Sequence, residues 1–422
     1  MRILYVSSLS PYPGDNGGRQ RTKLIWEALT KVGDVDFVLH SAWPVPQPAV
    51  EVLAAEYGLR QYHVSPEPEG TAFFPLLYVY PAWAYHGAQY YARRPVFYAV
   101  RPRPARAIGA LCESGEYDVV ISRYFRCACR SGLLEYGPLA IDVDDVDWEF
   151  FSSAAATNDV GVLKRWIFRR QARVLRGMMS RQLAGTELAW ITKAEDAAKI
   201  GPVRSRLLPN AVDATAAASP LAGRSPAEPV ILFVGALGWR PNQLGLLHFV
   251  RNVLPDVVSQ CPGVRLQIVG SNAPASFIGA IRSMPHVEFV GRVAEVLPYY
   301  LRCLFSIVPV DSGAGSHIKI LESLHFGVTC VTSVFGHRGY EQILKTGESL
   351  LAAADPKEFV RACVLLITNP ALRTRLAETG QRIVTERFSK DVFFRTVAAS
   401  IEELRSGARG GKVHRRGTVV GP

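Results

Sequence analysis

The sequence predicts an α/β protein built from two doubly wound, Rossmann-like domains that face a central cleft. Its 422 residues exceed the length at which a single hydrophobic core keeps growing. Short apolar strand patterns alternate with amphipathic helix patterns in both halves, as in parallel sheets with helical crossovers. A segment rich in Ala, Ser, Pro and Gly, residues 214–229, separates the two series and is predicted to be a linker.

The first series, residues 1–213, begins with a buried strand at Arg2–Ser7. The turn-rich stretch Pro11–Gly18 leads into an amphipathic helix through Leu24 and Leu29, and the strand Val35–His40 completes a strand, helix, strand unit. The later elements predicted in this half are strands at Tyr117–Ser122, Leu139–Val143 and near Ala189–Thr192, and a long helix from about Gly161 to Leu183.

The second series, residues 230–388, repeats this alternation. It contains predicted strands at Val230–Val234, Arg265–Val269, Val287–Val290, Phe305–Val310 and Thr329–Thr332, and a helix at Asn242–Leu254. A last helix, Ser389–Leu404 within residues 389–405, is expected to cross back to the first domain. The Gly- and Arg-rich tail, residues 406–422, has little to bury and is predicted to be disordered.

Composition limits the partners and the compartment. The net charge of +11 favours anionic partners, and without a nucleic-acid-binding motif these are phosphorylated substrates or a membrane surface. Seven scattered cysteines without C-x-x-C spacing indicate neither a disulfide framework nor a zinc site, so no metal is predicted. The opening apolar run is too short for a signal peptide, and no run reaches the ~18 residues that span a bilayer. We therefore expect a cytoplasmic protein, either soluble or peripheral on the inner face of the membrane.

The stretch Pro309–Glu322 is the most informative motif in the chain. A Gly-rich turn precedes a short helix, for which Ser316 is the predicted N-cap. Lys319 and Glu322 then share the face opposite the apolar residues. The helix start and the Lys319 charge suit a diphosphate, and the Glu322 carboxylate suits sugar hydroxyls such as those of ribose. The alternative is an ordinary helix start with a solvated Lys and Glu.

Two further segments carry charge. Ile141–Asp147 contains the D-x-D spacing of metal-dependent sites, but we interpret Asp144 and Asp145 as acceptor-side residues or loop-ordering residues. The aromatic segment Phe73–Tyr85, the arginines that follow it and the basic long helix favour an anionic membrane surface. A buried aromatic cluster and a solvated helix face are the alternatives.

Five segments together resemble the family 4 retaining glycosyltransferases of the GT-B fold, the glycosyltransferase group 1 type. They are the glycine-rich loop at Gly17 and Gly18, Leu208–Asp213, Phe233–Asn242, Val290–Arg292 and the Pro309–Glu322 motif. Their order and spacing match over about residues 1–405. The resemblance implies a hexosyltransferase-type enzyme that moves a sugar from a nucleoside diphosphate sugar to a glycan, a lipid-linked acceptor or a small molecule, with retention and without a further cofactor. Polysaccharide biosynthesis is a process that such an enzyme serves.

The resemblance also assigns roles to single residues. Lys319, Glu322 and Arg240 are the expected catalytic residues. Donor-binding positions are Gly17, Gly18, Gly315, Ser316, His317, Lys319, Glu322, Val290 and Arg292, and acceptor-side positions are Asp144, Asp145, Arg123 and Arg19.

The chain departs from the family pattern at three places. Ala314 stands eight residues before Glu322, where the family has a second Glu, and Asp311 is a candidate replacement. Ala236 and Asn242 stand where an Arg and a Lys are usual, so Arg240 is expected to supply the charge. The segment Val119–Arg126 lacks the histidine often found beside the reacting sugar.

Two other functions fit the same architecture: a nucleotide-sugar epimerase or hydrolase, and a non-catalytic nucleotide-binding subunit of another transferase. The sequence leaves open the base, the sugar, the acceptor, the linkage and the oligomeric state.

Overall fold

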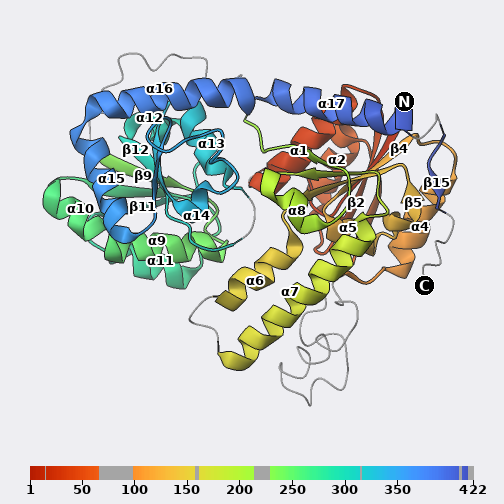
Figure 1. Cartoon of the computed structure of the whole chain (residues 1–422), viewed down its shortest axis with the longest axis horizontal. Helices are drawn as coiled ribbons and strands as arrows, with labels where there is room; N and C mark the ends of the chain where they lie inside the picture. Colours follow the sequence, from red (N-terminus) through yellow and green to blue (C-terminus); the bar gives the residue numbers. More distant parts are fainter. Residues whose placement is uncertain are drawn as a thin grey trace. The chain divides into compact units, whose positions relative to one another are not determined.

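A computed structural model describes residues 1–14, 16–65, 98–156, 161–212, 229–313, 316–407 and 411–416. The chain divides into two compact units (Figure 1). Unit 1 comprises Met1–Pro209 and Phe393–Pro422, and unit 2 comprises Asn210–Val392. Each contains one parallel sheet with helical crossovers, so the predicted class of two Rossmann-like domains is confirmed. Nearly all of the predicted linker, residues 214–229, lies outside the described residues.

Unit 1 is built on a seven-stranded sheet in which every neighbouring pair is parallel. In spatial order its strands are β3 (Leu59–Val64), β2 (Asp34–Ser41), β1 (Arg2–Ser7), β4 (Val119–Arg123), β6 (Leu139–Asp144), β7 (Leu188–Ile191) and β8 (Ser205–Leu207). The strand order reverses direction between β1 and β4. In open α/β sheets, ligands bind beyond the carboxyl ends of the strands at such a reversal.

The described helices of unit 1 follow the strands in the alternation that the sequence predicts. They are α1 (Gly17–Thr30), α2 (Gln47–Tyr57), α4 (Pro102–Glu113), α5 (Phe125–Arg130), α6 (Asp147–Ala156), α7 (Val162–Leu183) and α8 (Ala197–Ile200), with 3-10 turns η3 (Leu133–Glu135) and η4 (Ala194–Asp196). α6 and α7 pack side by side, and Phe151 of α6 contacts Phe168 of α7 at 6.1 Å between ring centroids (Figure 1). The long basic helix predicted at 161–183 is confirmed as α7.

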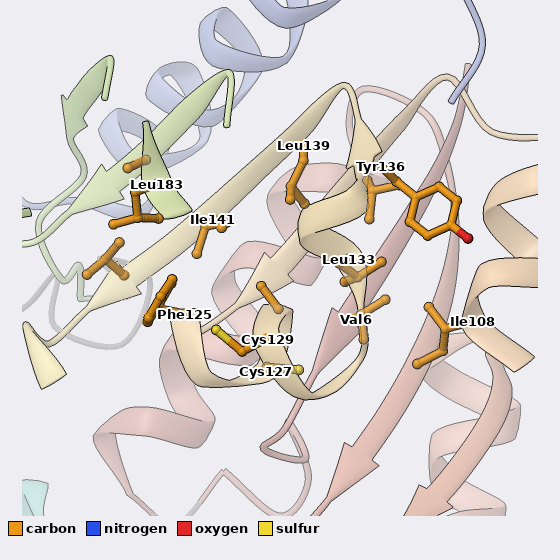
Figure 2. Close-up of a cluster of buried hydrophobic side chains, with 14 of the residues drawn as sticks. Val6, Ile108, Phe125, Cys127, Cys129, Leu133, Tyr136, Leu139, Ile141 and Leu183 are labelled. Carbon is orange, nitrogen blue, oxygen red and sulfur yellow. The ribbon is translucent and has the colours of Figure 1, made fainter. Parts of the chain in front are cut away.

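One core cluster of unit 1 lies on the sheet face that α4, α5 and α7 cover. Figure 2 shows part of it, where Ile141 of β6 and Phe125 of α5 lie with Leu183 of α7. All three side chains are buried. Burying an aliphatic or aromatic side chain of this size contributes roughly 1.5–3 kcal/mol, so this cluster is a main reason why the strand ends keep fixed positions.

Unit 2 is built on a six-stranded, all-parallel sheet. In spatial order its strands are β11 (Val287–Gly291), β10 (Arg265–Val269), β9 (Val230–Val234), β12 (Phe305–Val308), β13 (Cys330–Ser333) and β14 (Leu351–Ala353). Its helices are α9 (Arg240–Asn252), α10 (Leu254–Gln260), α11 (Ala275–Arg282), α12 (Leu297–Arg302), α13 (Ile318–His325), α14 (Val334–His337), α15 (Pro356–Thr368) and α16 (Pro370–Arg387). Here the strand order reverses between β9 and β12.

The last helix, α17 (Lys390–Gly407), joins unit 1 from Phe393 onward. Trp190 of β7 donates a hydrogen bond to Ser400 of α17 at 3.1 Å, and Arg206 of β8 pairs with Glu403 at 2.6 Å. These contacts agree with the predicted crossing of this helix back to the first domain.

The described part of the tail, residues 411–416, is ordered, which differs from the prediction of disorder. β15 (His414–Arg415) pairs antiparallel with β5 (Tyr136–Gly137), and Arg416 pairs with Glu187 at 2.5 Å. The Val413 side chain is buried in the core of unit 1. The Gly and Arg content was a poor guide here because carboxylates of unit 1, far away in sequence, bind the arginines.

Within the described residues, no helix combines the length and apolar character needed to cross a bilayer.

Candidate active site

The Pro309–Glu322 motif lies beyond β12, at the strand reversal of unit 2. Gly313 has φ +114°, and a Cβ there would lie 2.7 Å from the Trp239 ring. Only glycine adopts this backbone conformation without strain and leaves room for the ring. The loop is therefore held against the start of α9. Ala314 and Gly315, which the sequence places in this loop, lie outside the described residues.

The helix α13 begins one residue later than predicted, and His317, not Ser316, is its N-cap. The Ser316 hydroxyl instead accepts a hydrogen bond from the Asn210 side chain at 3.0 Å. The His317 ring is buried and contacts the rings of Trp239 and Phe335, with centroids 6.0 and 6.5 Å away. The prediction of Ser316 as N-cap is wrong because this tertiary hydrogen bond takes its hydroxyl.

Lys319 reaches from the first turn of α13 to the carboxyl end of β9. Its Nζ donates to Asn242 Oδ1 at 2.6 Å and lies 4.8 Å from the centroid of the Phe233 ring. A Cβ on Gly235 would be 3.2 Å from Nζ, so the glycine leaves room for the amine. Burial lowers the Lys319 pKa to about 7, although Glu322 acts in the opposite direction. Near neutral pH the amine is therefore poised between its charged and neutral forms.

Asn242 orients this lysine, a role that the sequence did not reveal. Its side chain is buried, and its Nδ2 donates to the Ala236 carbonyl at 2.8 Å. That bond turns Oδ1 toward Lys319. The two positions that depart from the family pattern, 236 and 242, thus hold the Lys319 ammonium in place through one hydrogen-bonded chain.

Glu322 lies one turn further along α13 and is partly buried. The Tyr300 hydroxyl donates to its Oε2 at 3.0 Å. Burial raises the Glu322 pKa, while Tyr300 and Lys319 act in the opposite direction. The structure thus adds Tyr300, on α12, to the neighbours of this carboxylate. No sequence pattern indicated Tyr300, because it is one of two adjacent tyrosines in a short helix.

The remaining donor-side residues of unit 2 are more exposed. Arg240 is the first residue of α9 and is exposed, on the same helix as Asn242. Val290 and Arg292 lie at the end of the edge strand β11, two strands away from β9. Asp311, the candidate for the missing carboxylate, is exposed, and partial burial of its carboxyl group raises its pKa. The described contacts thus join Lys319 and Glu322 through one helix, and leave the roles of these four residues as predictions.

Gly17 and Gly18 begin α1 in unit 1, and Asn16 caps this helix by accepting from the Arg19 amide at 3.1 Å. A Cβ on Gly18 would lie 2.8 Å from the Leu9 side chain and 3.1 Å from the Tyr124 hydroxyl. Gly18 therefore permits close packing within unit 1, and its predicted contact with phosphate stays a prediction.

The predicted acceptor residues Arg123 and Asp144 contact each other inside unit 1. Arg123 is fully buried and pairs with Asp142 and Asp144, both at 2.7 Å. Arg21, also buried, pairs with Asp142 at 2.6 Å. The D-x-D pair Asp142 and Asp144 is thus held by arginines within unit 1. Whether Asp144 orders the loop or faces the acceptor stays a prediction.

Asp145 differs from its neighbour. Burial and the adjacent Asp144 charge raise the Asp145 pKa to about 8, whereas Arg123 and Arg21 lower the pKa of Asp144 against the effect of burial. A carboxyl group with such a pKa is largely protonated at neutral pH and can donate a hydrogen bond. The acceptor-side role of Asp145 stays a prediction.

A pocket of about 330 Å³ opens at the strand reversal of unit 1. The ends of β1 and β2, the start of α1 and the helix α5 supply its walls. Its described lining residues are Ser8, Leu9, Ser10, Arg19, His40, Ser41, Ala42, Trp43, Pro44, Val45, Tyr124, Arg126, Cys127 and Arg130. Of the predicted acceptor residues, only Arg19 lines it. His40 and Arg130 come from separate parts of the chain, and no sequence pattern indicated them.

One cluster outside this pocket has the carboxylates of a metal site. Oxygens of Glu149, Glu195 and Asp196 lie within 4.8 Å of one another. Lys199 Nζ pairs with all three, at 2.6–3.2 Å. An ammonium group thus takes the place that a cation would need.

The fold is that of the GT-B glycosyltransferases. Sucrose-phosphate synthase from Thermosynechococcus elongatus superposes with a TM-score of 0.66 at 14% identity, covering 96% of this chain and all of that one. Anabaena HepE in complex with UDP and glucose gives 0.64 at 15% identity, with the same coverage. A glycosyltransferase from Rickettsia africae gives 0.63 at 11% identity, covering 97% of this chain and 99% of that one.

Residues 228–369 of unit 2 match the family model described as glycosyl transferases group 1. This match and the fold confirm the resemblance to group 1 glycosyltransferases of the GT-B fold that the sequence motifs indicated. The matched segment contains Asn242, Lys319 and Glu322. No curated protein matches the sequence.

Proposed function

We propose that the protein is a family 4 retaining glycosyltransferase that transfers a hexose from a nucleoside diphosphate sugar to a hydroxyl group of a glycan, a lipid-linked acceptor or a small molecule. The observation that carries the proposal is the placement of the Lys319 ammonium at the start of α13, beside Gly235 and one turn from Glu322. This arrangement suits a ligand that has a diphosphate at one end and a ribose next to it.

The chemistry requires stabilisation of a departing diphosphate. When the bond between the sugar and the phosphate breaks, negative charge grows on the leaving oxygen. Lys319 and the backbone N–H groups at the start of α13 supply fixed positive ends there. A bound diphosphate raises the pKa of Lys319 again, so the ammonium form is secured when substrate is present. Glu322, oriented by Tyr300, accepts hydrogen bonds from the ribose hydroxyls.

The test combines donor binding with turnover. The thermal midpoint of the protein is measured with UDP, GDP and ADP and with their glucose esters, and UDP is placed first because HepE, of the same fold, binds it. Lys319→Ala and Glu322→Ala are each expected to lower transfer at least about a hundredfold with the fold intact, the scale of one lost preorganised contact. Near-normal transfer in both variants would refute these roles.

Product analysis separates this function from the other two. A transferase forms product only with an acceptor, whereas an epimerase or hydrolase consumes the donor without one. Donor binding without any turnover, across glycan, lipid and small-molecule acceptors, would indicate a non-catalytic subunit.

We propose further that the enzyme works at the cytoplasmic surface of an anionic membrane. The α6–α7 pair exposes four large apolar side chains, three of them in the first two turns of α7: Phe150 (53%), Val162 (82%), Leu163 (64%) and Trp166 (49%). The helix α7 carries seven Lys or Arg residues and no acidic one. Exposed apolar groups beside cations fit the boundary between lipid headgroups and acyl chains. The predicted aromatic segment 73–85 lies outside the described residues.

Co-sedimentation with vesicles tests this location. The full chain is expected to bind vesicles of phosphatidylcholine with phosphatidylglycerol and to bind pure phosphatidylcholine weakly. Leu163→Glu is expected to weaken the binding, and Leu365→Glu, at an exposed leucine of unit 2, is the matched control. Equal binding of the vesicles by both variants would exclude the start of α7 as the membrane contact.

A further inference from the structure

The pocket of unit 1 has a lining of one charge sign. Arg19, Arg126 and Arg130 line it, and its described lining residues include no Asp or Glu. Arg19 donates to the Tyr12 carbonyl at 2.6 Å, and Arg130 donates to the Ser65 carbonyl. These bonds hold two of the guanidinium groups at the wall of the pocket.

A buried histidine adds an open hydrogen-bonding position. The His40 side chain is 2% exposed, and its Nδ1 is bonded to the Ser131 hydroxyl at 2.9 Å. Its Nε2 has no hydrogen-bond partner among the described residues. Burial and the charges of Arg130, His63 and Arg101 lower the His40 pKa to about 3, so the ring is neutral. In the tautomer in which Nδ1 accepts from the Ser131 hydroxyl, Nε2 carries a proton that it can donate to a ligand oxygen, and in the other tautomer Nε2 can accept a hydrogen bond.

The place in the fold is the one where a ligand is expected. The pocket lies beyond the carboxyl ends of β1 and β2, at the point where the strand order reverses. Trp43 is 58% exposed and Tyr124 is half-buried, and both lie in its wall. Aromatic faces suit the apolar face of a sugar ring or an isoprenoid chain, while the arginines suit an anion.

We propose that this pocket binds an anionic group of the acceptor, a phosphate or a carboxylate, through Arg19, Arg126 and His40. The inference rests on the proposed function, because it takes the ligand of unit 1 to be the acceptor. It adds the charge of the substrate class. Both a soluble sugar phosphate and a lipid-linked phosphate carry the required group.

Three matched pairs of ligands test the charge and its source, by calorimetry with the full chain. They are glucose 6-phosphate against glucose, glucuronate against glucose, and farnesyl phosphate against farnesol. The charged member of at least one pair is expected to bind about tenfold or more tightly, as for a single charge-assisted hydrogen bond. The first pair identifies a soluble phosphate, the second a carboxylate and the third a lipid-linked phosphate. Equal affinity within all three pairs overturns the proposal.

Variants show whether the pocket is responsible. Arg126→Gln is expected to remove most of the preference for the charged ligand, and Arg126→Lys, which retains the charge, to restore part of it. Arg106→Gln is the matched control, because Arg106 is exposed on α4 and bonds to a carbonyl of its own helix. A preference unchanged in Arg126→Gln, or lost equally in Arg106→Gln, contradicts the assignment.

Binding of UDP, measured on the same samples, separates this inference from the proposed function. If UDP binds normally and no pair shows a charge preference, only the anionic acceptor is wrong. If UDP, GDP and ADP all fail to bind, the proposed function is wrong, and a charge preference that depends on Arg126 still identifies the pocket as an anion site.

Discussion

At the scale of single residues, the site depends on an amine held away from water. A lysine with an ordinary pKa stays mostly charged up to about pH 10. Lys319 lies instead between the Phe233 ring and the Asn242 amide, where burial lowers its pKa to about 7. Such a group takes up a proton when an anion arrives, so the binding of a diphosphate is coupled to pH.

The affinity for UDP-glucose is therefore predicted to fall as the pH rises above about 7, by up to about tenfold per pH unit. The sign follows because the free protein has lost the proton there, while the bound protein, with its pKa raised by the diphosphate, retains it. The ester has no titrating phosphate in this range. Calorimetry in buffers of different ionisation enthalpy measures the proton uptake. Lys319→Met should bind weakly at every pH, and an equal slope in this variant would contradict the coupling.

Tyr300 orients the Glu322 carboxylate by donating a hydrogen bond to it. Tyr300→Phe removes the hydroxyl that donates to Glu322 and leaves the buried ring in place. We predict roughly tenfold weaker UDP binding and a nearly unchanged melting temperature, because one hydrogen bond to a charged group contributes about 1.5–3 kcal/mol. Tyr299→Phe, on the same helix, is the control. An effect confined to stability would show that Tyr300 acts only in packing.

At the scale of elements, the ends of β4 and β6 are fixed by charge. Asp142, in β6, accepts hydrogen bonds from Arg21 of α1 and Arg123 of β4 in a fully buried cluster. Without that carboxylate the two guanidinium groups would remain buried with less compensation. The cluster therefore holds three elements in register at the edge where the pocket opens.

Asp142→Asn is predicted to lower the free energy of unfolding of unit 1 by about 3–5 kcal/mol, the usual cost of breaking a buried ion pair. Urea unfolding followed by far-UV circular dichroism measures it. Glu386→Gln, in the exposed pair Arg382–Glu386, is the control and should cost under about 0.5 kcal/mol. A loss below 1 kcal/mol in Asp142→Asn would mean that the cluster relaxes or admits water.

Elements were also the scale at which the sequence predicted most. Short apolar runs locate the strands β1 and β9, and the helical spacing of apolar residues locates α7. Burial selects apolar residue types wherever a strand or a helix packs. The start of α13 was misplaced by one residue because the choice between Ser316 and His317 depended on Asn210, more than a hundred residues away. Local patterns contain no information about such a partner.

The residues of the candidate site also fall into those with a local sequence pattern and those that act through a tertiary contact. Lys319 and Glu322 could be predicted because they share one helix with a recognisable spacing. Asn242, Tyr300 and the pocket residue His40 could not, because each contributes through a tertiary contact. Arg123 and Asp144 were assigned to the acceptor side from their places in the sequence, and that pattern did not reveal that they pair with each other inside unit 1.

At the scale of the whole molecule, the two units differ in how many segments of the sequence form them. Unit 2 is one continuous segment, Asn210–Val392, whereas unit 1 needs residues from both ends of the chain. Ending the chain after Val392 is therefore predicted to abolish the cooperative unfolding of unit 1, because α17 covers Trp190 and pairs with Arg206. A chain ended after Gly407 keeps α17 and is the control.

Calorimetry with UDP measures this effect, because the nucleotide should shift only the transition of unit 2. Retention of both transitions in the chain ended after Val392 would show that α17 is dispensable for unit 1.

The divided sequence of unit 1 has a consequence for synthesis. Domains usually fold in the order in which the ribosome releases them, N-terminal first. Here the first domain to emerge lacks its closing helix until all of unit 2 has been synthesised. The nascent chain should therefore carry an unfinished N-terminal sheet, without the helix that bonds to Trp190, throughout the synthesis of unit 2. We expect chaperones to engage the chain at this stage.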